Sequence, residues 1–498
     1  MNITGIRNHF TNWREWELNP IVVKELRQAV RSWAVTGMLL LFLIILFVVS
    51  VAFLVFQSFD VDPDVRLGGA MFSVFVCILA VASIFFIPLY VGVRVAAERQ
   101  ENNPDLFYIS TLSPARIILG KFLCGAYMAV LFCSACMPFM AFTNLLRGVD
   151  LPTVFFILFY LFLIVCVAIM VAIFLACVPA SRPFKILFAI IGFIGSFWII
   201  IPMIAFSFEF LRSGIGASML ERNFWIASLT ATAIGLATIG LFFVMSVALI
   251  SPPSSNRGRP VRIYITAMWF LGGLLALGWI FKTGSGAAIA PWTISTFWLM
   301  FFALIVVVSN SDHLSQRVRR AIPQSPLKRA QAFLFFNGAA GGLVWVGMLL
   351  GLTLLISQEI SPLLPKVFST DRDWIILPIV IIYICAYALT GLFIHRKFFT
   401  RHSPKIAGLL VISLMAIWAL MPSVILFFLN ELSWKSVDHL ELGNIFNLIS
   451  MRDDKRLYYH FYFALAWLGL MLLLNAKWFF TQARNFRPPP KFVPPVIQ

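Results

Sequence analysis

The chain has 498 residues, of which 61% are hydrophobic and only 12% charged, and its formal net charge is +17. Soluble domains are about 45–50% apolar and about 25% charged. A water-soluble fold could not bury this much apolar surface, so the bilayer must be the solvent for most of it. The positive charges lie in short segments between apolar runs, as in the cytoplasmic loops of membrane proteins. The composition therefore excludes a soluble enzyme and predicts an integral membrane protein with no nucleic-acid partner.

Twelve apolar runs have the length of about 20 residues that a helix needs to cross the hydrocarbon core. They cover residues 34–57, 68–93, 122–144, 153–179, 186–207, 224–250, 263–281, 291–309, 333–358, 374–395, 406–430 and 458–476. None of the runs contains Asp, Glu, Lys or Arg. Proton- and ion-coupled transporters usually keep ionisable groups within the membrane. If this protein transports, we therefore expect its energy to come from a partner at the cytoplasmic face.

The segments between the runs alternate in charge. With a cytoplasmic N-terminus and one crossing per run, most of the 38 Lys and Arg residues lie inside and most of the 21 acidic residues lie outside. The positive-inside rule then predicts an even number of crossings and two cytoplasmic termini. The loop-like segment 251–259 divides the runs six and six. We predict an all-α protein with two six-span membrane units, residues 1–257 and 258–498, the second ending in a Pro-rich cytoplasmic tail.

Motifs that would indicate an enzyme are missing from the sequence. It contains no G-x-x-x-x-G-K-[ST] nucleotide loop, no H-E-x-x-H and no G-x-S-x-G. Cys133 and Cys136 form a C-x-x-C pair, but no second Cys or His pair accompanies it, so we interpret both as apolar residues of a helix. The sequence predicts no catalytic residue, no cofactor and no metal site on this chain.

The segment before the first run has the features of an amphipathic helix. Asn19 and Pro20 form a helix start, with Asn as the N-cap and Pro at the first helical position. One face then carries Val22, Leu26, Val30 and Trp33. This pattern predicts a helix in the membrane interface, in contact with lipids; an ordinary basic flank is the alternative. The residues that we assign to this interfacial helix are Asn19, Pro20, Lys24, Glu25 and Arg27.

Residues 98–121 connect the second and third runs on the predicted cytoplasmic side. Asn103-Pro104 and Ser113-Pro114 each start a helix, and an apolar stretch bracketed by charge lies between them. Exposed apolar residues rimmed by polar ones usually mark a docking surface; a re-entrant bend under the helices is the alternative. The predicted docking residues are Glu98, Arg99, Glu101, Asp105, Leu106, Phe107, Tyr108 and Ile109.

Both elements resemble the type-2 permeases of ATP-binding-cassette (ABC) exporters, the ABC-2 family. The sequence N-P-I-V-V-K-E-L-R at 19–27 is similar to the start of these permeases, and their loop after the second span reads E-R-x-x-G-T-x-E-L-L-L, then L-S-P-x-x-I-x-x-G-K. The chain departs at Asn102-Asn103, where Gly-Thr is usual, at Asp105, where Glu is usual, and at Thr111, where many members have Pro. The matching residues are Glu98, Arg99, Leu106, Leu112, Ser113, Pro114, Ile117, Gly120 and Lys121.

The resemblance covers residues 1 to about 250. It implies a six-span exporter permease in the bacterial cytoplasmic membrane, whose coupling helix between spans two and three docks on a separate ATPase subunit. Mg-ATP would bind that ATPase, and a second permease chain or a second copy of this chain is a further candidate partner. In the second half, Ser325-Pro326 stands where Ser113-Pro114 stands in the first, which suggests a diverged, fused permease unit.

Two other classes of function stay open. One is a membrane-embedded transferase or ligase for lipid-linked substrates, for which residues 431–456 would be the large external loop. The other is a scaffold subunit of a membrane complex that transports nothing. A neighbouring reading frame that encodes an ATPase would favour the permease over both. The sequence does not identify a substrate.

Overall fold

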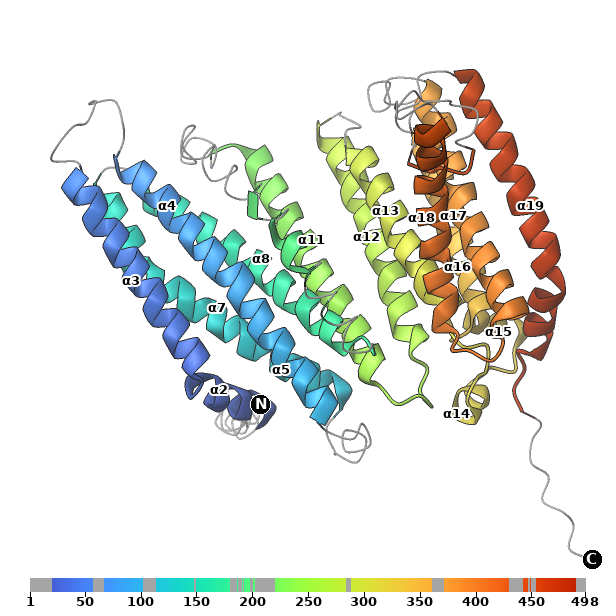
Figure 1. The fold of residues 1–498 in the computed structure, drawn as a ribbon, viewed down its shortest axis with the longest axis horizontal. Helices are drawn as coiled ribbons and strands as arrows, with labels where there is room; N and C mark the ends of the chain where they lie inside the picture. The colour runs from blue at the N-terminus through green and yellow to red at the C-terminus, as the bar shows by residue number, and fades with distance from the viewer. Residues whose placement is uncertain are drawn as a thin grey trace, which may run out of the picture. The chain divides into compact units, whose positions relative to one another are not determined.

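A computed structural model describes most of the chain and divides it into two compact units, Met1–Pro252 and Pro253–Gln498. The described ranges are 20–56, 67–101, 113–146, 149–179, 220–283, 288–360, 371–429 and 454–489, with short pieces of 186–201 and 442–448. Every regular element in these ranges is a helix, as the sequence predicts. Figure 1 labels the helices of each unit.

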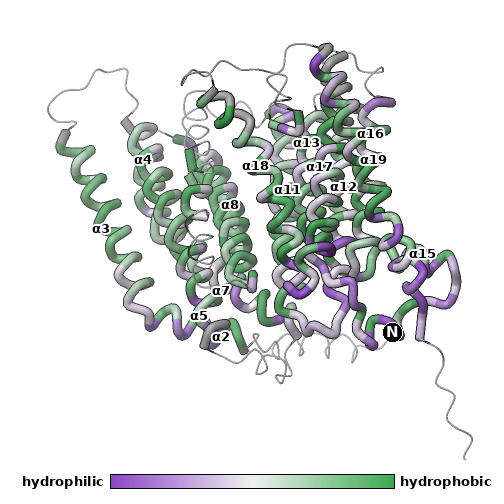
Figure 2. Tube along the Cα trace, turned by 45° about the vertical axis from the view of Figure 1, so that its right-hand side comes forward, coloured by the Kyte–Doolittle hydropathy of each residue, from purple (hydrophilic) through white to green (hydrophobic). Residues whose placement is uncertain are grey.

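Ten helices in these ranges are long and apolar enough to cross a membrane, which makes the chain a multi-pass membrane protein. Figure 2 shows their green, hydrophobic middles and the purple, hydrophilic residues gathered near their ends. The ten helices are Trp33–Val55, Gly68–Glu98, Pro114–Leu145, Leu151–Cys177, Arg222–Ile250, Gly258–Lys282, Ile289–Val308, Ala339–Glu359, Ile376–Phe398 and Arg456–Asn485. Each overlaps one of the twelve predicted runs.

The other two predicted spans stay predictions. The run at 186–207 lies mostly outside the described residues. The run at 406–430 corresponds to helix α18, Lys405–Leu429, whose described apolar stretch, Lys405–Met421, is shorter than a full span.

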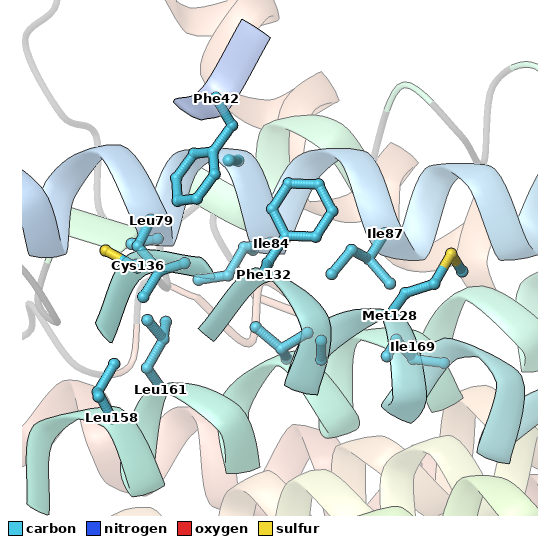
Figure 3. Packing of buried hydrophobic residues seen from close by; sticks show 14 of the residues in the cluster. Phe42, Leu79, Ile84, Ile87, Met128, Phe132, Cys136, Leu158, Leu161 and Ile169 are labelled. Carbon is cyan, nitrogen blue, oxygen red and sulfur yellow. The ribbon is translucent and has the colours of Figure 1, made fainter. Parts of the chain in front are cut away.

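Unit 1 is a bundle organised around α8 (Leu151–Cys177), which packs against α5 (Ile87–Glu101), α7 (Pro114–Leu145) and α11 (Arg222–Ile250). Its core is built from large apolar side chains. Figure 3 shows Phe42 of α3 (Trp33–Phe56), Phe132 of α7 and Leu161 of α8 among them. The short helix α2 (Pro20–Val30) precedes α3 and packs on α7.

A turn of π-helix interrupts the second span of unit 1. Ala82–Phe86 forms this turn, η1, between α4 (Leu67–Val81) and α5. The buried stripe of α4 includes Phe72 and Leu79, whereas that of α5 includes Ile87 and Val91. One inserted residue rotates the rest of the helix by about 100° relative to a continuous α-helix. The π turn therefore sets which side of α5 faces α2 and α7.

Unit 2 contains eight described helices. Among them α17 packs against α18 and α19, and α13 packs against α16 and α18. The eight are α12 (Gly258–Thr283), α13 (Ile289–Val308), α14 (Gln316–Arg320), α15 (Pro326–Phe335), α16 (Ala339–Ile360), α17 (Asp371–Phe398), α18 (Lys405–Leu429) and α19 (Asp454–Asn485). Helix α15 begins after Ser325 with Pro326 in its first turn.

A buried arginine binds the backbone of the bend between α15 and α16. Arg262 of α12 is 2% exposed, and its guanidinium donates to the carbonyl oxygens of Leu334 (2.7 Å), Phe336 (2.6 Å) and Gly338 (2.8 Å). Gly338 has a φ of 130°, which favours glycine. The predicted run at 333–358 is therefore a bend followed by a helix, because the backbone oxygens at the bend are satisfied by Arg262 rather than by a continuing helix.

Candidate functional site

Three helices of unit 1 converge on the segment predicted to dock a partner. The last turns of α5 lead into residues 102–112, and α7 begins directly after them at Pro114. Helix α2 packs across the first turns of α7. Residues 102–112 themselves lie outside the described part of the chain. The described site thus consists of the helix ends that flank this segment in the sequence, together with α2.

The sequence explains why α7 begins where it does. Ser113 is the N-cap, with an extended backbone, and its hydroxyl accepts a hydrogen bond from the Arg116 amide at 3.4 Å. Pro114 follows at a position where its missing N–H costs nothing. Lys121 lies seven residues further on, two helical turns away, on the same face as Pro114. That face turns toward α2 and α5.

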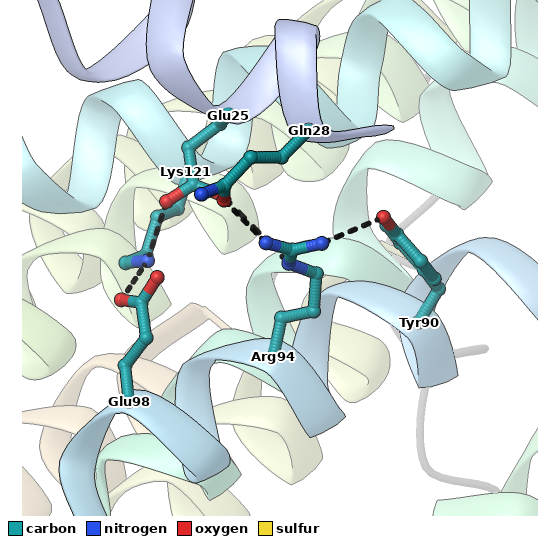
Figure 4. A network of polar contacts seen from close by, with 6 residues as sticks. All are labelled: Glu25, Gln28, Tyr90, Arg94, Glu98 and Lys121. Carbon is teal, nitrogen blue, oxygen red and sulfur yellow. Dashed lines mark hydrogen bonds and ion pairs between the residues drawn. The ribbon is translucent and has the colours of Figure 1, made fainter. Parts of the chain in front are cut away.

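Lys121 is the centre of a buried charge network. Its Nζ lies 3.0 Å from Glu25 Oε1 of α2 and 2.6 Å from Glu98 Oε2 of α5 (Figure 4). The side chains of Lys121 and Glu25 are both 6% exposed, and that of Glu98 is 24% exposed. One ammonium group therefore joins three helices that are distant in the sequence.

Arg94 extends the network on α5. Its Nε lies 4.0 Å from Glu25 Oε2, one guanidinium nitrogen donates to Tyr90 Oη at 3.1 Å, and the other donates to Gln28 Oε1. Figure 4 shows the guanidinium between Gln28 and Tyr90. Two cations and two carboxylates thus balance, and each buried charge has a partner, as burial in a low-dielectric region requires.

This network of ion pairs connects α2, the end of α5 and the start of α7. Burying an ion pair contributes little net stability, but removing one partner is strongly destabilising. The network therefore penalises any movement that separates α2, the end of α5 and the start of α7.

The outward face of α2 has a different character. Lys24, Arg27 and Arg31 are exposed, and with Val23 and Gln28 they line a groove of about 430 Å³. The buried face carries Val22, Glu25 and Ala29, while Val30 and Trp33 of the predicted apolar face are exposed. Helix α2 therefore turns one side to α7 and leaves basic and apolar side chains on the other. This is consistent with a helix in the membrane interface.

The structure describes some of the predicted site residues and not others. Glu25 and Glu98, assigned to two separate elements, meet at Lys121, and Lys24 and Arg27 are exposed on α2. Pro20 is the first residue of α2. The remaining predicted residues have no described side chain: Asn19, Arg99, Glu101, Asp105, Leu106, Phe107, Tyr108 and Ile109.

Sequence reasoning missed Arg94, Tyr90, Gln28 and the role of Lys121 in the site. Arg94 and Lys121 lie just outside the predicted runs, and the helices continue past those runs to include them. The available signal was a pair of opposite charges, Glu98 and Lys121, at the two facing ends of consecutive spans. In the described residues no group of three or more His, Cys, Asp or Glu side chains could hold a metal ion.

Comparison with known proteins found no matching family model, no matching curated protein and no matching solved structure. The function of the chain is therefore inferred from its own residues.

Proposed function

We propose that this chain is the transmembrane permease subunit of an ABC exporter, driven by a separate ATPase that docks on the segment between α5 and α7. The observation that carries the proposal is the network of Glu25, Glu98 and Lys121. Each of these residues lies in one of the two motifs that resemble the ABC-2 family, and the network ties the docking segment to the helix before the first span.

The proposed mechanism is mechanical. The ATPase binds Leu106, Phe107 and Tyr108 in a groove, with Glu98, Arg99, Glu101 and Asp105 at the rim. Rearrangement of the ATPase during its nucleotide cycle displaces the ends of α5 and α7. Because Lys121 joins both ends to Glu25, α2 and the first span move with them. Mg-ATP stays on the partner, and this chain contributes no catalytic residue.

Two aromatic side chains provide the test. A buried aromatic anchor typically costs about 2 kcal/mol or more when it is truncated, so the double variant Phe107→Ala, Tyr108→Ala should weaken ATPase binding about a thousandfold if the losses add. The measurement is the Mg-ATP hydrolysis that copurifies with the tagged chain from its native membrane. The matched control is Tyr458→Ala, Tyr459→Ala, which removes an exposed aromatic pair at the start of α19.

The expected result is that wild type and control retain the copurifying ATPase and the loop variant loses it. If the loop variant retains wild-type hydrolysis, the segment is not the docking site. If wild type itself copurifies with no ATPase, the permease assignment fails and a scaffold or a membrane-embedded transferase replaces it. Hydrolysis by a pure, partner-free chain would also contradict a separate ATPase.

A further inference from the structure

The sequence of unit 2 is strongly basic in the segments that the predicted topology places in the cytoplasm. Residues 253–262, 309–332, 396–405 and 477–498 contain only one acidic residue, Asp312. Its carboxylate accepts a hydrogen bond from Trp478 Nε1 at 2.9 Å. In unit 1, by contrast, Lys121 and Arg94 are paired with Glu25 and Glu98.

A small hydrophobic cluster gathers several of these segments into one surface. Val318 and Ile322, in and just after α14, are buried with Ala332 of α15, Phe336 and Phe486. The ring of Phe486 lies 5.3 Å from that of Phe333 and 6.0 Å from that of Phe336. Helices α14 and α15 and the end of α19 therefore form one platform; in Figure 1 the three lie together at one end of unit 2.

The cations of this platform point away from its apolar centre. Because Val318 and Phe486 share one cluster, the basic residues that flank them in sequence are neighbours in space. Six are exposed, and in the described residues none of them has an ion pair: Arg317, Arg319, Arg320, Lys328, Arg484 and Arg487. The platform is an uncompensated positive surface, which attracts anions.

The position of the platform selects the kind of anion. Arg484 lies in the last turn of a membrane-spanning helix, and Phe480, one turn earlier, is 69% exposed. Leu327, beside Lys328, is 74% exposed. Exposed apolar side chains mixed with Lys and Arg at the end of a span are typical of the depth at which lipid headgroups meet acyl chains. A soluble acidic partner would not require the apolar residues.

We propose that the α14–α15–α19 platform binds anionic glycerophospholipids, whose phosphates contact the arginines while their acyl chains contact Leu327 and Phe480. This is a property of unit 2 and does not depend on ATPase docking. Each basic residue near an anionic membrane surface strengthens binding about fivefold, from about 1 kcal/mol. Binding should weaken as salt is raised, because salt screens exposed charges.

The experiment uses the purified, delipidated full chain. Native mass spectrometry measures binding of phosphatidylglycerol and of phosphatidylcholine with the same acyl chains. Arg317→Gln, Arg320→Gln should weaken phosphatidylglycerol binding about thirtyfold, and Arg317→Lys, Arg320→Lys should retain it. The control Arg222→Gln, Lys282→Gln removes two exposed cations that the predicted topology places on the external side, and it should have no effect.

A second double variant, Arg484→Gln, Arg487→Gln, tests a different element of the same platform and should give a similar loss. The proposal is overturned if both platform variants bind phosphatidylglycerol like wild type. It is also overturned if wild type binds phosphatidylcholine equally well. A soluble polyglutamate, added at the same total negative charge as the lipid, should displace phosphatidylglycerol only if the platform binds acidic proteins; such displacement would overturn the lipid proposal.

Discussion

Replacing Lys121 by Met removes the only ammonium group that, among the described residues, contacts both Glu25 and Glu98. Met has a similar length, so the loss is mainly one of charge. Glu98 is 24% exposed and can be hydrated, whereas Glu25, at 6% exposed, keeps only Arg94 at 4.0 Å. Breaking a buried pair by removing one partner costs about 3–5 kcal/mol. We expect a loss of about 3 kcal/mol, at the lower end of this range, because Arg94 still compensates Glu25 in part.

The assay is reversible unfolding in a mixed-detergent titration, followed by far-ultraviolet circular dichroism. Neutralising Glu25 in the same background, Lys121→Met with Glu25→Gln, should recover about 2 kcal/mol, because the uncompensated buried carboxylate is gone. Lys24→Met is the matched control. It removes an exposed lysine from α2, the helix that packs against α7, and should change the free energy of unfolding by less than about 0.5 kcal/mol. The reasoning is refuted if Lys121→Met is as stable as wild type, or if Glu25→Gln adds further destabilisation to it.

Three further changes test other parts of the fold. Reporter fusions after Arg259 and after Gln498 should read cytoplasmic and one after Thr370 external; an external reading at Gln498 would mean an odd number of spans. Arg262→Leu should destabilise unit 2 by about 3 kcal/mol in the same titration, because it orphans carbonyl oxygens at the α15–α16 bend; an unchanged midpoint would show that the bend does not need it. Gly443→Ala should cost about 2 kcal/mol, since Gly443 has a φ of 99° and a Cβ there would lie 2.6 Å from a ring carbon of Trp418; wild-type stability would contradict this geometry.

The membrane character and the helical class could be predicted from the sequence because the bilayer imposes them directly. A backbone in hydrocarbon must satisfy its own hydrogen bonds, so a long apolar run becomes a helix whatever its neighbours are. Ten of the predicted runs are helices of spanning length for this reason. The start of α7 could also be predicted, because Ser followed by Pro specifies a helix start through local chemistry alone.

The residues at which the spanning helices end could not be predicted as well from the sequence. The apolar run that predicts a span ends at the first charged residue. The helix itself can continue past that residue when its charge is paired. Arg94 and Glu98 remain helical in α5, and Lys121 lies two turns into α7. Lys121 pairs with Glu98 and Glu25, and Arg94 pairs with Glu25. The π turn at Ala82–Phe86 also has no sequence signature, yet it decides which side of α5 turns toward α2.

By itself the sequence determined that the chain crosses the membrane, where most crossings lie, and which two segments outside the apolar runs carry unusual residues. Those properties depend on composition and on neighbours within a few positions. Only the tertiary structure decided that Glu25, Glu98 and Lys121 form one buried network and that Arg262 satisfies the bend before α16. These contacts join residues far apart in the chain, between 23 and 96 positions for the network. Their geometry depends on how whole helices pack, which no local pattern in the sequence encodes.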